Sequence, residues 1–296
     1  MYKIIKKEQL SDVVWLMDVE APLVARHCEP GQFLIAKKDE AGERIPLTIC
    51  DYDREKGYVT IVFQPVGVST EKFLELQEGD FFEDIVGPLG KPSAILSMSE
   101  EKLHHTKFLF VAGGVGTAPV YPQVKWLHEH GADADVIIGA RTKGLIFFED
   151  KMRAVAGNLF ITTDDGSYRH KGVVTTVIDE QVEKGVRYDH CVAIGPMIMM
   201  KFCCLTTRKY NIPTIVSMNP IMIDGTGMCG ACRLTLDGEI KFACVDGPEF
   251  DGSKINWAEC MKRTQMYKTE EGRAKLRYEE GKTHSGNCGN CDGGDK

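Results

Sequence analysis

The sequence lacks any apolar run that would predict a membrane-spanning or exported chain. No stretch of its 296 residues approaches the length of about 18 apolar residues that a membrane helix requires. The basic start, MYKIIKKEQL, is followed by acids at Asp12, Asp18 and Glu20 instead of the apolar core of a signal peptide. The sequence therefore predicts a soluble protein of the cytoplasm.

An excess of positive charge is also absent, because the formal net charge is −7. Nucleic acid is not expected as the main partner, since binding to phosphates needs a basic surface. The 11 cysteines of a cytoplasmic chain do not predict a disulfide framework. Six of them are scattered and are expected to be small buried hydrophobic residues. These six are Cys28, Cys50, Cys191, Cys203, Cys204 and Cys260.

The length predicts about two domains, and 43% hydrophobic residues are enough for substantial cores. Residues 1–100 contain short β-branched or aromatic runs separated by glycine and proline turns. This pattern predicts a small antiparallel β-barrel. The expected strands are Val13–Met17, Phe33–Ala36, Tyr58–Phe63 and Phe81–Val86.

Residues 101–217 have a different character, in which buried strands alternate with helices. Lys107–Ala112 is a continuous apolar run, a glycine-rich turn follows, and a helix is expected to continue to about His130. Alternating strands and helices predict a parallel α/β sheet. The further expected strands are Asp135–Ala140, Leu159–Thr162, His190–Ile194 and Thr214–Ser217.

After Met218 the periodicity stops, and residues 219–250 are expected to form loops around three cysteines. We interpret residues 218–250 as a metal-cluster segment and residues 251–296 as a helical or mobile extension. One amphipathic helix is expected over Trp257–Tyr267. The polar end carries Cys288 and Cys291, to which the sequence assigns no role.

A glycine-rich turn, GGVGTAP at residues 113–119, follows a strand and opens a helix. Glycines at such a turn let the backbone approach a pyrophosphate, whose charge is favoured at the helix N-terminus. Tight packing of strand against helix is the alternative explanation of the same glycines. The nucleotide contacts predicted here are Gly113, Gly114, Val115, Gly116, Thr117 and Pro119.

The turn reads G-x-G-x-x-P, with Pro119 in the first helical turn, and in this form it resembles the ferredoxin–NADP reductase superfamily. That resemblance implies an FAD-binding antiparallel barrel followed by a nucleotide-binding α/β domain. It also implies a Gly-Pro pair beside the nicotinamide. Gly195-Pro196, followed by Met197, matches it after the strand ending at Ile194.

The flavin motif of the superfamily, Arg-x-aromatic/apolar-Ser/Thr, is matched by Arg44 to Thr48. The resemblance implies that Arg44 pairs with phosphate, that Leu47 packs on the isoalloxazine and that Thr48 reaches the ring edge. A surface arginine beside an edge strand is the alternative. The full set of predicted FAD contacts is Arg44, Pro46, Leu47, Thr48, Phe63, Gln64, Val66, Gly67, Ser69 and Thr70.

Two further segments support a flavin barrel. Gly67, Ser69 and Thr70 can form a second phosphate-binding turn at a helix N-terminus. The G-P-L-G run at residues 87–90 is typical of the family at the end of the barrel. Three matches in family order before the GGVGTAP turn are more specific than any one of them.

The strongest local motif is Cys229-Gly-Ala-Cys232, followed by Cys244 and preceded by Asp224. A C-x₄-C-x₂-C run with a distant fourth cysteine is the plant-type [2Fe–2S] pattern, and here Asp224 occupies the first position. A carboxylate is a harder ligand than a thiolate. We expect Asp224 to ligate iron and to raise the reduction potential, or alternatively to cap the loop, leaving water or Cys203/Cys204 as the fourth ligand. Zinc is the competing metal.

The chain to about residue 250 resembles the electron-transfer subunit of dihydroorotate dehydrogenase. It resembles even more closely the small subunit of NADH-dependent reduced ferredoxin:NADP oxidoreductase, also called sulfide dehydrogenase. Thr163–Tyr168, TDDGSY, adds to the match. The resemblance implies hydride transfer between NADH and FAD, single electrons passing to a [2Fe–2S] cluster, and a larger partner subunit where bifurcation occurs. No side-chain acid or base is implied.

The choice between NADH and NADPH stays open. Arg141 and Lys143 lie where a 2′-phosphate would bind and favour NADPH, whereas the resemblance favours NADH. Asp164, Asp165, Arg169 and Lys171 are expected near the nucleotide edge. A zinc-stabilised nucleotide-binding regulator is the alternative outside redox chemistry.

Overall fold

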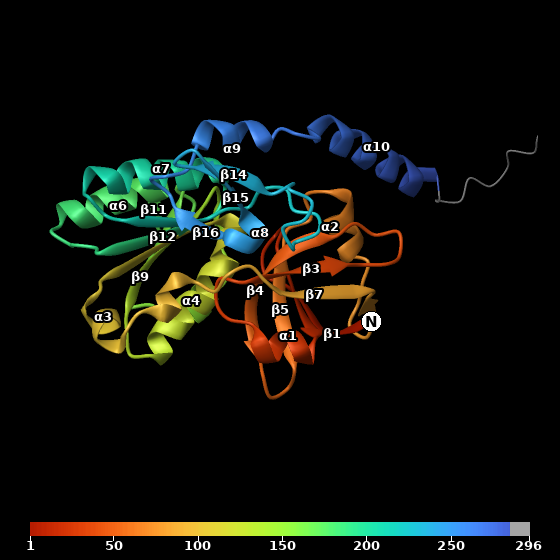
Figure 1. The fold of residues 1–296 in the computed structure, drawn as a ribbon, viewed down its shortest axis with the longest axis horizontal. Coiled ribbons are helices and arrows are strands. Elements are labelled where there is room, and N and C mark those ends of the chain that lie inside the picture. Colours follow the sequence, from red (N-terminus) through yellow and green to blue (C-terminus); the bar gives the residue numbers. More distant parts are fainter. Residues whose placement is uncertain (285–296) are drawn as a thin grey trace, which may run out of the picture.

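A computed structural model describes residues 1–284 and contains two seven-stranded sheets, with a C-terminal segment lying across both (Figure 1). The first sheet has the order β6-β1-β2-β5-β4-β3-β7, and every pair in it is antiparallel. The predicted antiparallel barrel is confirmed. Its elements are β1 (Tyr2–Gln9), β2 (Trp15–Glu20), α1 (Pro22–His27), β3 (Phe33–Lys37), β4 (Ile45–Asp53), β5 (Tyr58–Phe63), α2 (Val68–Phe73), β6 (Phe81–Phe82) and β7 (Asp84–Leu89).

The barrel curves around an apolar interior in which aromatic rings meet edge to face, and its end strands β6 and β7 are not paired with each other. Phe73 lies between Phe63 and Phe82, with ring centroids 5.7 and 5.0 Å away. Strand β1 was missing from the sequence prediction because its three lysines and Glu8 interrupt any regular alternation of apolar residues. The second strand begins at Trp15, not at Val13, since Trp15 pairs with Phe63.

The second sheet has the order β11-β10-β9-β8-β12-β13-β16 and is parallel except for β16. All six residues of its central strand β8 are buried, which explains the continuous apolar run. The predicted parallel α/β sheet is confirmed. Its strands are β8 (Phe108–Gly113), β9 (Ala134–Ala140), β10 (Asn158–Thr163), β11 (His170–Lys171), β12 (His190–Ile194), β13 (Thr214–Ser217) and β16 (Glu249–Asp251).

Helices cover both faces of this sheet, and each face meets a different neighbour. On one face, a core cluster includes Val124 of α4 together with the barrel residues Leu16 and Val62. On the other face, residues of α6 and α7 share a core with Cys232 and Cys244 of the cluster segment. The helices are α3 (Glu100–His105), α4 (Thr117–Glu129), α5 (Glu149–Arg153), α6 (Val174–Glu183) and α7 (Met197–Lys209).

The expectation that residues 219–250 are only loops is wrong in part. They contain a hairpin and a short helix, followed by β16, and the four-residue strands are too short to give a readable period. The expected helix over Trp257–Tyr267 ends at Arg263, and Tyr267 has a φ of 66°. The elements are β14 (Arg233–Leu236), β15 (Glu239–Phe242), α8 (Ala243–Asp246), α9 (Trp257–Arg263) and α10 (Lys268–His284).

Helix α10 was not predicted separately because it has no apolar face, so periodicity does not reveal it. It runs from α9 toward the barrel (Figure 1), where Lys275 and Glu71 of α2 form an ion pair at 3.2 Å. Cys288 and Cys291 lie outside the described residues. Within residues 1–284, no helix combines the length and the apolar character needed to cross a membrane.

The six scattered cysteines are all buried and unpaired, as predicted. Burial raises the pKa of the Cys28 and Cys204 thiols to about 12 in each case. These thiols therefore act as small apolar groups at neutral pH.

Candidate functional site

The glycine turn joins β8 to α4 at the carboxyl edge of the parallel sheet. Gly114 has a φ of +54° and faces open space, so glycine is favoured there by conformation. At position 116 glycine is required by lack of space, because a Cβ there would lie 2.2 Å from the carbonyl oxygen of Ile194. The hydroxyl of Thr117 donates to the Gly114 oxygen at 2.9 Å and closes the turn. The turn therefore combines a position closed by packing at Gly116 with an open position at Gly114.

The Gly195-Pro196 pair lies directly beside the glycine turn. A Cβ on Gly113 would be 3.0 Å from Cδ of Pro196, and one on Gly195 would be 3.0 Å from the Gly113 oxygen. Strands β8 and β12 are neighbours, so their ends meet. Met197, the first residue of α7, is buried. Two motifs about 80 residues apart in the sequence therefore form one edge, where α/β sheets bind nucleotides.

The loops after β9 and β10 extend this edge. The amides of Asp164 and Asp165 donate to the oxygens of Ala140 and Arg141 at 3.0 and 3.2 Å. Hydrogen bonds from the side chain and the amide of Ser167 lower the pKa of Asp165, and the amide donates to the Asp165 carboxylate at 2.9 Å. Arg141 is exposed. The predicted residues Arg141, Asp164 and Asp165 thus share one loop pair, with the Asp165 side chain engaged in the turn.

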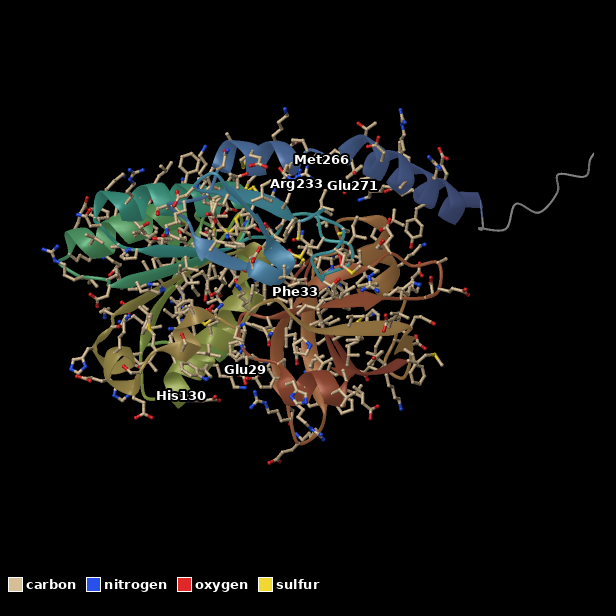
Figure 2. All side chains as sticks on the ribbon, in the orientation of Figure 1. Glu29, Phe33, His130, Arg233, Met266 and Glu271 are labelled. Atoms are coloured by element: carbon tan, nitrogen blue, oxygen red, sulfur yellow. The ribbon has the colours of Figure 1, made fainter. Side chains whose placement is uncertain are left out.

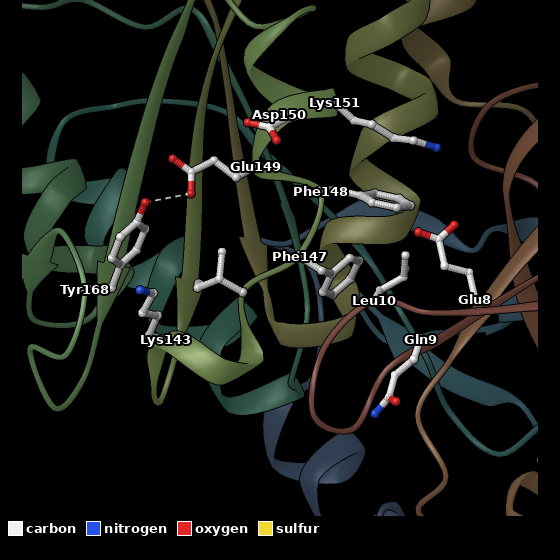
Figure 3. A pocket seen from close by; sticks show the side chains of 11 residues that line it. Glu8, Gln9, Leu10, Lys143, Phe147, Phe148, Glu149, Asp150, Lys151 and Tyr168 are labelled. Atoms are coloured by element: carbon white, nitrogen blue, oxygen red, sulfur yellow. Dashed lines mark hydrogen bonds between the residues drawn. The ribbon is translucent and has the colours of Figure 1, made fainter.

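A cavity of about 370 Å³ adjoins these loops (Figure 3). Tyr168 and Lys143 line one side, and the Tyr168 hydroxyl donates to Glu149 at 3.0 Å. Lys143 lies 5.2 Å from the centre of the Tyr168 ring. Residues Glu8 to Leu10 of the barrel line the opposite side. The cavity is thus shared by the two domains at the edge of the loops after β9 and β10.

The flavin motif lies at the start of β4, where the residues from Arg44 to Thr48 are all half-buried. A strand with one buried face normally alternates between buried and exposed side chains. Here Thr48 pairs with Phe33 of β3, and Leu47 pairs with Leu34. The strand therefore leaves a partly covered surface at the motif, beside Phe33.

The second predicted phosphate turn contains a local hydrogen-bond cluster. The amides of Val66 and Gly67 donate to the Thr70 hydroxyl oxygen at 3.1 and 3.2 Å, and that hydroxyl donates to the Gly67 oxygen at 3.0 Å. Ser69 donates to Glu43. Gly67 is the N-cap of α2. The structure brings these residues together at a helix start, with their polar groups bonded to one another.

Arg44 makes a contact that the sequence did not reveal. Its Nε donates to the oxygen of Ile223 at 3.1 Å, and its Nη2 to the oxygen of Asp224 at 3.3 Å. Asp84 lies 3.7 Å from its Nη1. The arginine of the flavin motif therefore holds the backbone at the start of the cysteine loop, 180 residues further along the chain.

Two thiols of the cysteine motif meet in the structure. Cys232 and Cys244 are buried, and their Sγ atoms lie 3.3 Å apart. Burial, together with the hydrogen bond to Cys232, raises the pKa of Cys244. Cys229 is exposed on the same loop. In the part of the chain that the structure describes, no three His, Cys, Asp or Glu side chains converge as a ready metal site.

Asp224 caps the loop, one of the two roles considered for it. Its Oδ1 accepts from the Thr226 amide at 2.8 Å, and its Oδ2 accepts from the Cys229 amide at 3.0 Å. Hydrogen bonds from Thr226 and Cys229 hold the pKa of Asp224 well below its usual range. The carboxylate is thus ionised at neutral pH, and its ligation of iron stays a prediction.

The cysteine loop packs on the barrel and is anchored from α9. A Cβ on Gly225 would lie 2.6 Å from Ile35. Phe33 of the barrel, labelled in Figure 2, belongs by its contacts to the same core cluster as Cys232 and Cys244. Arg263 of α9 donates from Nη2 to the oxygen of Ala231 at 2.8 Å. Neither Phe33 nor Arg263 carried a motif, so sequence reasoning missed both.

Comparisons with known proteins agree with this arrangement. A model of the iron–sulfur cluster binding domain of dihydroorotate dehydrogenase B matches residues 219–256. A protein of Thermotoga maritima named dihydroorotate dehydrogenase B (NAD(+)) electron transfer subunit homolog is 43% identical over 94% of both chains. The chain belongs to the family of dihydroorotate dehydrogenase B electron-transfer subunits. The family resemblance read from the sequence is confirmed.

Two further similar proteins match over most of the chain. A Clostridium beijerinckii protein described as an uncharacterized protein in the adh 3′ region is 59% identical over 98% of both chains. A structure solved for NADH-dependent reduced ferredoxin–NADP oxidoreductase, described for flavin-based electron bifurcation, is 43% identical with a TM-score of 0.87. It covers 94% of this chain, and this chain covers 98% of it.

Proposed function

We propose that this chain is the electron-transfer flavoprotein subunit of a flavin-based electron-bifurcating NADH-dependent reduced ferredoxin–NADP oxidoreductase. One observation carries the proposal: Arg44 of the flavin motif holds the oxygens of Ile223 and Asp224 at the start of the cysteine loop. Flavin and cluster sites thus share a boundary, as electron transfer between them requires. We place the protein in the cytoplasm.

The barrel residues fit FAD. The half-buried surface from Pro46 to Thr48 suits a flat apolar ring, and Arg44 offers a cation to a phosphate. When bound, FAD exchanges hydride with a nicotinamide nucleotide and single electrons with a [2Fe–2S] cluster. The proposed contacts are Arg44, Pro46, Leu47, Thr48, Phe63, Gln64, Val66, Gly67, Ser69 and Thr70.

The carboxyl edge of the second sheet fits a nicotinamide nucleotide. Helix α4 is 13 residues long, and its N-terminus attracts phosphate beside an open Gly114. The chain's task there is positioning, which brings reacting atoms to about 3–3.5 Å. The proposed contacts are Gly113, Gly114, Val115, Gly116, Thr117, Pro119, Arg141, Asp164, Asp165, Gly195, Pro196 and Met197.

The cysteine loop fits an iron–sulfur cluster by its donors. Cys232 and Cys244 already lie together, and Gly225, Gly227 and Gly230 have positive φ angles that let the loop curl. An ionised carboxylate has about four lone-pair sites, so Asp224 can keep both backbone hydrogen bonds and offer an oxygen to iron. We propose Asp224, Cys229, Cys232 and Cys244 as ligands. The matched family model describes iron–sulfur binding, which removes the support for zinc.

We propose that successive segments of the chain bind different cofactors. Residues 1–100 bind FAD, residues 101–217 bind the nucleotide, residues 218–250 bind the cluster, and residues 251–296 form the extension. A larger flavin and iron–sulfur subunit is the proposed partner. Dihydroorotate dehydrogenase is the alternative partner, because relatives bear that name.

An anaerobic purification from the native host tests the proposal. We expect flavin absorbance, iron and acid-labile sulfide in the chain, together with copurification of a larger flavin and iron–sulfur protein. Copurification of a dihydroorotate dehydrogenase would establish the alternative. A colourless preparation without iron or acid-labile sulfide would refute both.

A further inference from the structure

Three polar side chains from distant parts of the chain meet where the barrel, the nucleotide domain and the cluster segment join. Ser93 lies in the connector after β7, Gln123 lies in α4, and Glu249 begins β16. The Ser93 Oγ is 3.1 Å from Gln123 Oε1 and 2.8 Å from Glu249 Oε2. The Gln123 Nε2 donates to Glu249 Oε1 at 2.6 Å. The three side chains form a closed triangle of contacts.

The charge of Glu249 determines how many of the three contacts can contain a hydrogen. If its carboxylate is ionised, the single hydroxyl hydrogen of Ser93 must serve two oxygens, one on Gln123 and one on Glu249. One of these contacts then has no hydrogen. If Oε2 of Glu249 carries a proton, it donates to Ser93, Ser93 donates to Gln123, and Gln123 donates back to Glu249. Every contact then has one donor and one acceptor.

This result does not depend on how the amide of Gln123 is oriented. With its oxygen and nitrogen exchanged, the amide nitrogen donates to Ser93 and the Ser93 hydroxyl donates to Glu249. The remaining contact joins the amide oxygen of Gln123 to an oxygen of Glu249. It again needs a proton on the carboxyl group.

Among residues 1–284, no lysine, arginine or histidine forms an ion pair with Glu249. Ser93 is 2% exposed and Gln123 is 1% exposed, so the partners themselves are sequestered from water. Glu249 as a whole residue is half-buried, with its carboxyl group turned inward to Ser93 and Gln123. Burial of that carboxyl group raises the pKa of Glu249, and the hydrogen bonds from Ser93 and Gln123 oppose that rise. On the packed elements, Lys125 pairs with Asp51 at 2.9 Å.

The other charged groups near these elements are directed elsewhere. Asp251 of β16 accepts from the amide of Ser253 at 2.9 Å and faces Lys254. Lys91 of the connector is exposed, and its amide donates to the oxygen of Gly247 at 2.7 Å. Among the described residues, Glu249 therefore has neutral hydrogen-bond partners.

We propose that Glu249 carries a proton in the folded protein and that Ser93, Gln123 and Glu249 form a closed ring of three hydrogen bonds that positions the cluster segment. Glu249 follows Cys244 by five residues in the sequence. The ring therefore fixes the chain after Cys244 to both the connector and α4. Glu249 is a positioning residue, and loss of its proton opens one of the three bonds.

Glu249→Gln tests the ring, because an amide supplies the donor and the acceptor of a protonated acid at every pH. Urea unfolding of the holoprotein is followed from pH 5 to pH 9, with Glu40→Gln on an exposed loop as the matched control. Folded Glu249 holds its proton more tightly than the unfolded chain does. Wild-type stability is thus complete below the unfolded pKa and is lost as pH rises through the folded pKa.

Between the pKa of Glu249 in the unfolded chain and its pKa in the folded protein, Glu249 makes the equilibrium constant for unfolding depend on pH. In wild type and in Glu40→Gln this constant rises by up to about tenfold per pH unit. Glu249→Gln lacks this rise and becomes the more stable protein at high pH. Ser93→Ala unfolds at lower urea than Glu249→Gln because it opens the ring. Infrared spectra of wild type show the carbonyl stretch of a protonated acid, which Glu249→Gln removes.

If Glu249→Gln is less stable than wild type at every pH and keeps the same pH slope, the carboxyl is ionised and the ring is refuted. This inference concerns the junction and not the bound cofactors. Flavin and iron contents measured on the same samples test the proposed function separately.

Discussion

The nucleotide domain and the cluster segment achieve order by different means. In the nucleotide domain, backbone atoms are closely packed. Gly116 lies against the carbonyl group of Ile194, and the preceding strand β8 is completely buried. The cysteine loop instead relies on a few directed contacts from Arg44, Asp224 and Arg263. The first site is fixed by close packing, whereas the second combines packing of Gly225 on Ile35 with individual polar contacts and, as we propose, with a bound cluster.

The largest expected effect is at the cysteine loop. Cys244→Ser removes one of two adjoining buried thiols, and we expect bound iron to fall to background because thiolates hold the cluster. Iron and acid-labile sulfide analysis measures this loss. Cys260→Ser, a buried cysteine of α9 outside the motif, is the control and should retain iron. Equal iron in both variants would show that Cys244 is not a ligand.

The packing of the nucleotide domain is tested at its tightest glycine. Gly116→Ala places a methyl group 2.2 Å from a carbonyl oxygen, and we expect the free energy of unfolding to fall by about 3 kcal/mol. Gly114→Ala meets no atom within 4 Å and carries only the strain of a φ of +54°, about 1–2 kcal/mol. Urea unfolding compares the two. A larger loss for Gly114→Ala would contradict the packing argument.

The contact between the two cofactor sites is tested at Arg44. Arg44→Gln removes a cation from the proposed phosphate site, and a charge-assisted hydrogen bond contributes about 1.5–3 kcal/mol. FAD affinity should therefore fall by about ten- to a hundredfold in a titration of the apoprotein. Arg54→Gln removes an arginine that pairs with Glu29 at 2.8 Å instead, and should leave FAD affinity unchanged.

The smallest effect separates the two roles of Asp224. Asp224→Ala removes the cap from the Thr226 and Cys229 amides, and we expect a loss of about 1 kcal/mol in the free energy of unfolding. Asp224→Asn keeps an acceptor oxygen as the control. If Asp224 also ligates iron, both variants shift the midpoint potential in a redox titration. An unchanged cluster in Asp224→Ala would leave capping as its only role.

Much of the fold could be predicted because its signals are local. Lys107–Ala112 was predicted as a buried strand from its composition alone, and the structure has this strand at Phe108–Gly113, directly before the glycine turn. Strand β1 and helix α10 were missed because their lysines and glutamates give no apolar period. The hairpin of β14 and β15 was missed because four residues are too few to show alternation.

In the candidate site, too, the residues could be predicted from local patterns, but their arrangement in space could not. The motif residues from Arg44 to Thr48 and from Cys229 to Cys244 could be named from their order and spacing. Their mutual positions could not. Nothing in the sequence links Arg44 to the oxygen of Asp224, because the arginine donates to backbone atoms that every residue possesses.

The amino-acid sequence by itself determined the two sheets, the kinds of donor available to cofactors and the family, because these follow from local periodicity and motif spelling. Only the tertiary structure decided which segments touch. It set Arg44 on the cysteine loop and closed Ser93, Gln123 and Glu249 into one triangle. Contacts between residues far apart in the chain depend on how packed layers meet, and no local pattern records that geometry.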